Sequence, residues 1–324
     1  MEPESIRISA TDYHTAGEPF RIVTHPCPEG ATVLERREWA AHRLDHVRRL
    51  LVSEPRGHAG MYGGFVTPPD DPGADLGVVF FHGSGYSTAC GHGTIALVTW
   101  ALESGRLPAR RGEGETEVVV DVPSGRLRTW ATVRDGDVTG VRFRNVPAFV
   151  LRRGVRVEGC VVDLAFGGAF YALAPAPTPL TPEHLPELVT RGRAVAEALR
   201  RRDDIAHPKR PELRGLYGVI WTEGRRNLTV FADGQVDRSP CGSGTSARLA
   251  LLHAEGALAR GETLRHQSVI GTEFLGRVVG ETRVAGLPAV ITEIEGTAHL
   301  TGHHEFVLEP GDPLGPGFQL GSGG

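Results

Sequence analysis

The 324-residue sequence predicts an α+β fold made of two similar halves, each with a curved, mostly antiparallel sheet around a central helix. The prediction depends on a gapless internal repeat, on a strand-like segment before each copy of the repeat, and on a helical pattern after each copy. Many other strand-like segments are divided by glycine or Asp-Gly turns, which favour antiparallel pairing. We expect residues 1–135 plus 305–324 to form an N-terminal lobe and residues 136–304 to form a C-terminal lobe.

The internal repeat is a Cys-Gly-x-Gly-Thr motif. Its first copy, ACGHGTIA, occupies residues 89–96 and contains Cys90, and its second copy, PCGSGTSA, occupies residues 240–247 and contains Cys241. The offset is 241 − 90 = 151 throughout the motif. Each expected lobe therefore carries one cysteine in the same local context.

The other elements are predicted in chain order from the spacing of apolar residues. Strands are expected at residues 5–10, 77–81, 116–122, 126–133, 140–145, 156–164, 170–174, 219–222, 227–231, 274–281, 289–295 and 298–308. Helices are expected at residues 34–52 and 182–202 and directly after each cysteine motif, where Gly105 and Gly256 are the expected C-terminal caps. Short strands therefore outnumber helices in both halves.

Composition and charge limit the classes of partner. The net charge is 35 − 39 = −4, and no block of like charges indicates a nucleic-acid partner. No apolar run reaches the roughly 18 residues of a membrane span, and the first residues do not resemble a secretory leader. Four cysteines are too few for a disulfide framework in a chain of this length. We therefore expect a cytoplasmic protein with a small-molecule ligand.

The lysine count argues against pyridoxal phosphate. That cofactor needs a lysine for its Schiff base. Lys209 is the only lysine of the chain, and it lies in a polar segment interrupted by prolines. The sequence also lacks a His-Glu-x-x-His motif and paired Cys-x-x-Cys motifs, so no metal site is expected. We therefore expect chemistry without a cofactor.

The repeated cysteines suggest a specific reaction. A cysteine at the start of a helix experiences the helix dipole and unpaired N–H groups, which lower the thiol pKa from about 8.5 toward neutral. The glycines after each cysteine let a ligand approach the backbone, and helix N-termini favour carboxylates. Two thiols on opposite faces of a bound carbon can invert it, because one removes the α-proton and the other returns a proton. The alternative for each cysteine is an inert buried thiol, as we expect for Cys27 and Cys160.

Five segments carry a resemblance to a known family. They are DYHTAGE (12–18), EPRGH (54–58), ACGHG (89–93), DLAFGG (163–168) and DRSPCGSGTSA (237–247). These segments are similar to signature segments of the proline racemase family, which also contains hydroxyproline 2-epimerases and trans-3-hydroxyproline dehydratases. The resemblance extends from near residue 8 to near residue 310, and its most specific part is the Asp-Arg-Ser-Pro-Cys-Gly segment.

The resemblance implies a diaminopimelate-epimerase-like fold with the substrate in the cleft between two lobes, and it suggests a homodimer. By motif matching, Cys90 and Cys241 would be the acid–base pair. The residues expected to bind substrate are Gly91, His92, Gly242 and Ser243 at its carboxylate, His92 and Asp237 at its ring nitrogen, and Tyr62 and Phe231 around its ring. Related dehydratases usually carry threonine at the position of Cys241, so retention of both thiols favours a racemase or epimerase.

We therefore predict a cofactor-independent racemase or 2-epimerase of proline or hydroxyproline. A trans-3-hydroxy-L-proline dehydratase is the main alternative, because the same carbanion could expel a 3-hydroxyl group. A dinucleotide-binding oxidoreductase is a further alternative, since both motifs fit Gly-x-Gly-x-x-Ala, but the expected strands do not form a βαβ series. A non-catalytic binding module would have no use for two reactive thiols.

Overall fold

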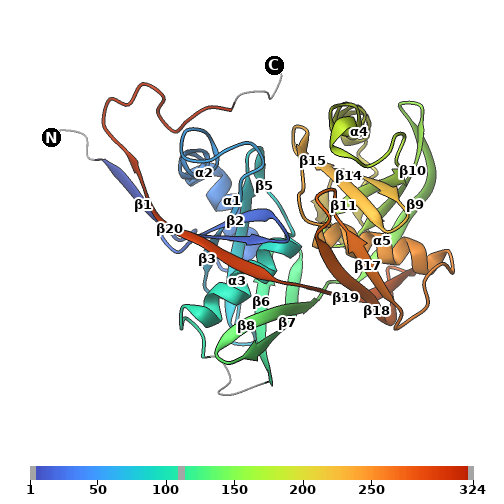
Figure 1. Ribbon diagram of the computed structural model, residues 1–324, viewed down its shortest axis with the longest axis horizontal. Helices are drawn as coiled ribbons and strands as arrows, with labels where there is room; N and C mark the ends of the chain where they lie inside the picture. The colour runs from blue at the N-terminus through green and yellow to red at the C-terminus, as the bar shows by residue number, and fades with distance from the viewer. Residues whose placement is uncertain (1–4, 109–113, 320–324) are drawn as a thin grey trace.

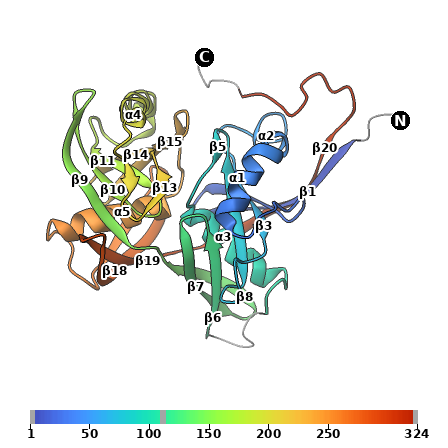
Figure 2. The same cartoon turned by 180° about the vertical axis from the view of Figure 1, so that it is seen from behind.

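Two helices at the centre of the molecule, each surrounded by strands, organise the fold (Figures 1 and 2). The computed structural model describes residues 5–108 and 114–319. Eighteen of the described strands are joined by hydrogen bonds into one continuous sheet, and β12 (Ala206–His207) and β13 (Arg210–Arg214) form a separate pair. The α+β class predicted from the sequence is confirmed.

The first group of elements surrounds helix α3 (Gly91–Glu103). Its strands are β1 (Ile6–Thr15), β2 (Glu18–Val23), β3 (Tyr62–Thr67), β4 (Leu76–His82), β5 (Gly85–Tyr86), β6 (Gly114–Val122), β7 (Gly125–Arg134), β8 (Asp137–Arg144) and β20 (Ala298–Leu308). Helices α1 (Val33–Arg43) and α2 (Asp45–Val52) cover the other face of this part of the sheet.

The second group surrounds helix α5 (Gly242–Ala254). Its strands are β9 (Ala148–Val157), β10 (Cys160–Phe166), β11 (Phe170–Pro175), β14 (Leu216–Glu223), β15 (Arg226–Phe231), β16 (Gln235–Val236), β17 (Thr263–Gln267), β18 (Glu273–Val284) and β19 (Leu287–Gly296). Helix α4 (Leu185–Arg200), preceded by a 3-10 turn η1 (Pro182–His184), packs on the outside of this group.

The strand pairing of the first group recurs in the second. β2 pairs in parallel with β3, as β11 does with β14, and β4 pairs in parallel with β6, as β15 does with β17. The antiparallel series β6, β7, β8 corresponds to the series β17, β18, β19. The repeat seen in the sequence thus extends to the strands around both helices. The lobe boundaries stay a prediction, because the sheet continues from β8 into β19.

Helix α3 forms the middle of the first core. Every residue from Gly91 to Leu102 is buried, which is typical of a helix packed on all sides. Both central helices end as expected, since Gly105 has φ of +70° and Gly256 has φ of +71°, the left-handed conformation that favours glycine after a helix. No helix among the described residues is long and apolar enough to cross a bilayer.

Two predicted elements each join two separate elements of the structure. The helix expected at 34–52 is interrupted at Leu44, where the change of direction lets both α1 and α2 bury apolar residues on the sheet. The strand expected at 156–164 is the end of β9 and the start of β10, because Glu158 and Gly159 adopt positive φ and reverse the chain. Strand β3 was not predicted, since Gly63 and Gly64 weaken its apolar pattern.

Candidate active site

The N-termini of α3 and α5 meet at a pair of glycines. A Cβ atom on Gly91 would lie 2.5 Å from the Cα atom of Gly242, and a Cβ atom on Gly242 would lie 2.7 Å from the Cα atom of Gly91. Neither position has room for a side chain. The first N–H groups of a helix have no acceptor within the helix, so two sets of such donors lie close together here.

A small cavity lies beside this contact. Its volume is about 10 Å³, room for roughly one water molecule. Its lining consists of Tyr62, Ala89, Cys90, Gly91, His92, Tyr171, Tyr217, Phe231, Asp237, Cys241, Gly242 and Ser243. The structure therefore brings together all nine residues that the sequence singled out, from both groups of strands.

The two cysteines have different immediate partners. Cys90 is the N-cap of α3, and its sulfur accepts a hydrogen bond from the Gly93 N–H at 3.2 Å. The Cys241 sulfur lies 3.5 Å from the hydroxyl of Tyr171, and Cys241 has φ of +64°, in the sparsely populated left-handed region. Both side chains are buried, with 6% and 5% of the residue surface exposed. No described cysteine forms a disulfide.

Burial determines the protonation of these thiols. It raises the pKa of Cys90 well above its ordinary value, and it raises the pKa of Cys241 to about 12, with the charge of Asp237 as a further cause. The N–H groups of Gly93 and Gly244 act in the opposite direction but are outweighed. The expected lowering by the helix N-terminus is therefore wrong for this closed geometry, because removing a thiolate from water costs more than these donors return.

Asp237 supplies a carboxylate to the cavity from the loop after β16. Its Oδ1 accepts hydrogen bonds from the N–H of Ser239 at 2.8 Å and from the Ser239 hydroxyl at 2.7 Å. Burial raises the pKa of Asp237 to about 6, while the Ser239 bonds and the charge of Arg238 lower it. The carboxylate is thus held in a fixed orientation and is ionised at neutral pH.

His92 is a neutral side chain in this site. Burial lowers its pKa to about 3, and the nearby Arg238 charge contributes to the shift. The imidazole donates a hydrogen bond to the carbonyl of Pro19, and Thr15 donates to the backbone carbonyl of His92 at 2.9 Å. The β1–β2 hairpin therefore positions both the ring and the backbone of His92.

Phenol groups form one wall of the cavity. The hydroxyl of Tyr62 is hydrogen-bonded to Ser87 and lies 3.1 Å from the hydroxyl of Tyr217. The ring of Tyr217 stacks on the ring of Phe231, with the ring centroids 5.7 Å apart. Sequence reasoning missed Tyr171, Tyr217 and Ser87. The signal that the sequence offered for the two tyrosines was the small number of tyrosines in the chain, since three of the five line this cavity.

No group of three or more His, Cys, Asp or Glu side chains within residues 5–108 and 114–319 has an arrangement that could hold a metal ion. The acid–base groups of the cavity are two thiols, one carboxylate and three phenols, with a neutral imidazole beside them.

Comparison with known proteins places the chain in a family. The family profile described as proline racemase matches residues 10–319. The chain belongs to the proline racemase family. A curated relative in this family is a 3-hydroxyproline 2-epimerase from Burkholderia multivorans, 44% identical over 96% of this chain and 97% of the relative. A trans-3-hydroxy-L-proline dehydratase from Azospirillum brasilense has the same identity and the same coverage of both chains.

A solved structure in the proline racemase family has the same fold. It is a hydroxyproline epimerase from Agrobacterium vitis with bound trans-4-hydroxy-L-proline, 31% identical, with a TM-score of 0.90 over 99% of this chain and 97% of that chain. Family membership confirms the prediction that the protein is an isomerase.

Proposed function

We propose that this chain inverts the α-carbon of hydroxyproline or proline by acid–base catalysis with Cys90 and Cys241. The observation that carries the proposal is the placement of two thiols, one at the start of α3 and one at the start of α5, on the lining of a single cavity. Elements of both strand groups build this cavity, so the sulfurs approach a bound carbon from different parts of the chain.

The proposed inversion needs one proton transfer on each face. The thiolate of one cysteine takes the α-proton and becomes a thiol, leaving a carbanion conjugated with the carboxylate. The thiol of the other cysteine then donates its proton to the opposite face and becomes a thiolate. The reaction is balanced without a redox step or a further reactant.

Groups on the cavity wall would bind the two charges of the substrate. The backbone N–H groups of Gly91, His92, Gly242 and Ser243 at the two helix starts suit its carboxylate. The Asp237 carboxylate suits its ring ammonium, and the neutral His92 adds no repulsion there. The negative charge of Asp237 raises the pKa of both thiols. The ring ammonium of a bound substrate would offset this charge and so favour formation of a thiolate.

The phenol groups favour a hydroxylated ring over proline. The Tyr62 and Tyr217 hydroxyls and Ser87 offer hydrogen bonds to a ring hydroxyl, which proline lacks. A site built to bind a hydroxyl disfavours the analogue without it, because its own polar groups are then left unpaired. The names of the curated relatives, which refer to 3-hydroxyproline, support the same preference.

Dehydration of trans-3-hydroxy-L-proline is the second candidate. A relative named as a dehydratase is as similar to this chain as the relative named as an epimerase, and this supports the second candidate. In that reaction the carbanion expels the 3-hydroxyl, which takes up a proton and leaves as water, and the resulting enamine becomes an imine when a proton moves from the ring nitrogen to C3. Both reactions begin with the same proton abstraction. Inversion also needs an acid on the opposite face of the substrate, and the presence of Cys241 as that second acid favours inversion.

The proposal includes the arrangement of the whole molecule. The N-terminal lobe would carry Cys90, the C-terminal lobe would carry Cys241, and the substrate would bind between them, because each central helix has its own surrounding strands. A homodimer and a cytoplasmic location stay expectations. Sedimentation of the purified chain tests the first of these.

Proton NMR with three substrates tests the proposed function. The purified enzyme is incubated separately in heavy water with L-proline, trans-4-hydroxy-L-proline and trans-3-hydroxy-L-proline, and the α-proton signal is followed. We expect loss of that signal, most rapidly for a hydroxyproline, where the ring-proton signals of the 2-epimer also appear; inversion of proline is followed by polarimetry, because its two enantiomers have identical spectra. An imine product from the third substrate would instead establish the dehydratase. Absence of change in all three tubes would contradict both candidates.

A further inference from the structure

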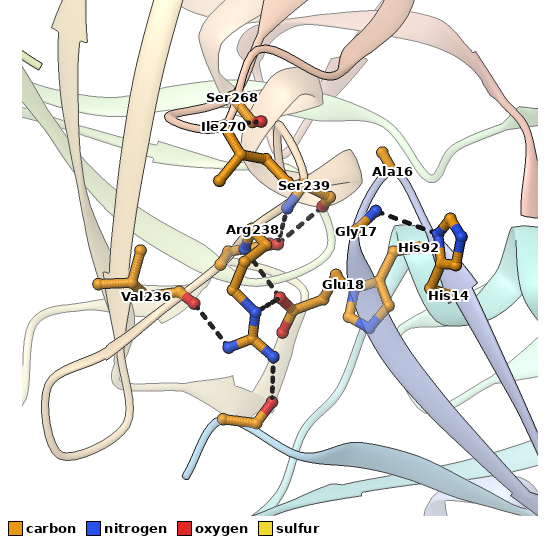
Figure 3. Close-up of polar contacts among 12 residues, drawn as sticks. His14, Ala16, Gly17, Glu18, His92, Val236, Arg238, Ser239, Ser268 and Ile270 are labelled. Carbon is orange, nitrogen blue, oxygen red and sulfur yellow. Dashed lines mark hydrogen bonds and ion pairs between the residues drawn. The ribbon is translucent and has the colours of Figure 1, made fainter. Parts of the chain in front are cut away.

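Glu18, which is buried, and Arg238, whose side chain is 25% exposed, form an ion pair beside the cavity that joins the two strand groups (Figure 3). Glu18 is the first residue of β2, and Arg238 lies between β16 and α5. Oε2 of Glu18 accepts a hydrogen bond from the backbone N–H of Arg238 at 2.8 Å and forms an ion pair with Nε of the same residue at 2.9 Å. The pair therefore fixes both the backbone and the side chain of Arg238.

The guanidinium of Arg238 makes two more hydrogen bonds, one within the second group and one that bridges the two groups. It donates to the carbonyl of Val236 at 3.1 Å and to the carbonyl of Gly60, just before β3, at 3.1 Å. A Cβ atom on Gly60 would lie 2.2 Å from a guanidinium nitrogen, so only glycine leaves room for this contact. Thr272 adds a bond to the carbonyl of Ala16 at 2.8 Å on the same side of the cavity.

Stability does not explain this pair. Glu18 has no exposed surface, and its Oε1 has no hydrogen-bond partner among the described residues. Burial raises its pKa well above the ordinary value, and the Asp237 charge adds to the shift. An ion pair whose carboxylate is fully buried with one unsatisfied oxygen contributes little net stability, because the cost of desolvating the carboxylate offsets the attraction. Its position points to another role.

That role follows from the neighbours of Arg238 in the chain. Arg238 lies between Asp237, the proposed partner of the ring nitrogen, and Ser239, which orients the Asp237 carboxylate. Fixing the Arg238 backbone against β2 therefore fixes the direction in which Asp237 enters the cavity. The same bonds join the two strand groups beside the cavity that contains the thiols.

We propose that Glu18 and Arg238 are a positioning pair, which holds Asp237 in place and keeps the site closed over Cys90 and Cys241. The positioning of Asp237 depends on the proposed function, whereas the closing of the site does not. Loss of the pair separates the two strand groups more often, exposes the thiols to solvent and weakens substrate binding.

Thiol labelling tests the closing role without any assay of activity. Iodoacetamide is added to the wild-type chain and to the Glu18→Ala, Glu18→Gln and Arg238→Met variants, and labelling of each cysteine is followed by mass spectrometry. Exposed Cys27 is the internal reference. Cys241 is the reporter, because the Glu18 charge also shifts the pKa of Cys90. Glu117→Gln, which breaks an exposed pair with Arg128, is the matched control.

We expect the ratio of Cys241 to Cys27 labelling to rise about tenfold or more in Glu18→Ala and Arg238→Met, as loss of a charged hydrogen bond predicts. Glu18→Gln should show a smaller rise, because an amide oxygen still accepts the bonds from Arg238. Glu117→Gln should match the wild type. A wild-type ratio in all the Glu18 and Arg238 variants would overturn the closing role.

Steady-state kinetics tests the positioning role. We expect KM to rise about tenfold or more in Glu18→Ala, and less in Glu18→Gln, while the thermal midpoint of Glu18→Gln stays near that of the wild type. A KM equal to that of the wild type in both variants would overturn the positioning of Asp237. If the wild-type enzyme inverts none of the three substrates, the proposed function and the positioning role both fail, and labelling still decides the closing role.

Discussion

Cys90 and Cys241 occupy the same position of the repeat but have different neighbours. The His92 ring is close to the sulfur of Cys90, whereas the Tyr171 hydroxyl and the Asp237 carboxyl are close to the sulfur of Cys241. Each sulfur is proposed to serve a different face of the substrate. Neither can then replace the other.

This inequivalence leads to a prediction for single substitutions. Cys90→Ser and Cys241→Ser should each lower the rate of inversion by about 10²- to 10⁴-fold, because a hydroxyl is a much weaker acid and base than a thiol near neutral pH. The assay is polarimetry on the preferred substrate, with circular dichroism as the check on folding. Cys160→Ser, outside the cavity, is the control. Substantial inversion by either active-site variant would rule out the two-thiol mechanism.

The raised pKa of Asp237 leads to a pH prediction. Because this pKa is about 6, the carboxyl is mostly protonated below that pH and cannot hold the ring ammonium. We expect kcat/KM to fall about tenfold per pH unit as the pH decreases below 6. Asp237→Asn should lower kcat/KM at neutral pH and remove this dependence. If kcat/KM of the variant still falls in the same way below pH 6, another group is responsible for the fall.

The sequence predicted the site residues that lie in or beside local motifs. Cys90, Cys241 and the residues following them could be found because the repeat places them at matching positions. Tyr171 and Tyr217 could not be found, since β11 and β14 reach the cavity only through long-range pairing. The thiol pKa was mispredicted because burial is a property of the assembled site.

Among the elements, the ends of the central helices are the clearest match between sequence and structure. Gly105 and Gly256 follow α3 and α5 with positive φ, and a Cβ atom on either would touch nothing within 4 Å. The cost of a side chain there is therefore only conformational. The break at Leu44 was not predictable, because both helices continue one apolar pattern and only their packing on the sheet separates them.

The glycine that caps the end of α3 leads to a prediction for stability. Gly105→Ala should lower the free energy of unfolding by about 1 kcal/mol, because alanine is strained at positive φ. Gly140→Ala is the matched control, since Gly140 lies in β8 without a positive φ and an added Cβ atom would have no neighbour closer than 3.9 Å. Urea denaturation measures both variants. Equal stability of the two variants would show that the cap does not constrain α3.

For the whole molecule, the continuous sheet explains how distant residues reach one small cavity. Pairing between β8 and β19 joins the strand groups, and the starts of α3 and α5 meet between them. The motifs predicted that two similar units exist, but they carry no information on how the units contact each other. The cavity between the strand groups has a volume of only about 10 Å³. Under the proposed function, the strand groups therefore move apart when the substrate ring enters.

A planar mimic of the carbanion should stabilise the closed arrangement. We expect pyrrole-2-carboxylate to protect Cys90 and Cys241 from iodoacetate and to leave the labelling of Cys27 unchanged. Peptide mass spectrometry with and without the mimic measures this selectivity. Equal protection of Cys27 would indicate a nonspecific effect, and no protection of any cysteine would place the ligand elsewhere.

The origin of the proton in the product tests the two-thiol account most directly. The preferred substrate is converted in heavy water and stopped at low conversion, and deuterium at the α-carbon of the inverted product is measured by mass spectrometry. A thiol carries one proton, so the proton taken by one sulfur cannot be delivered by the other. We predict that nearly every product molecule contains one solvent deuteron at this carbon. Product that retains the substrate's own α-proton would contradict the account and indicate a single base.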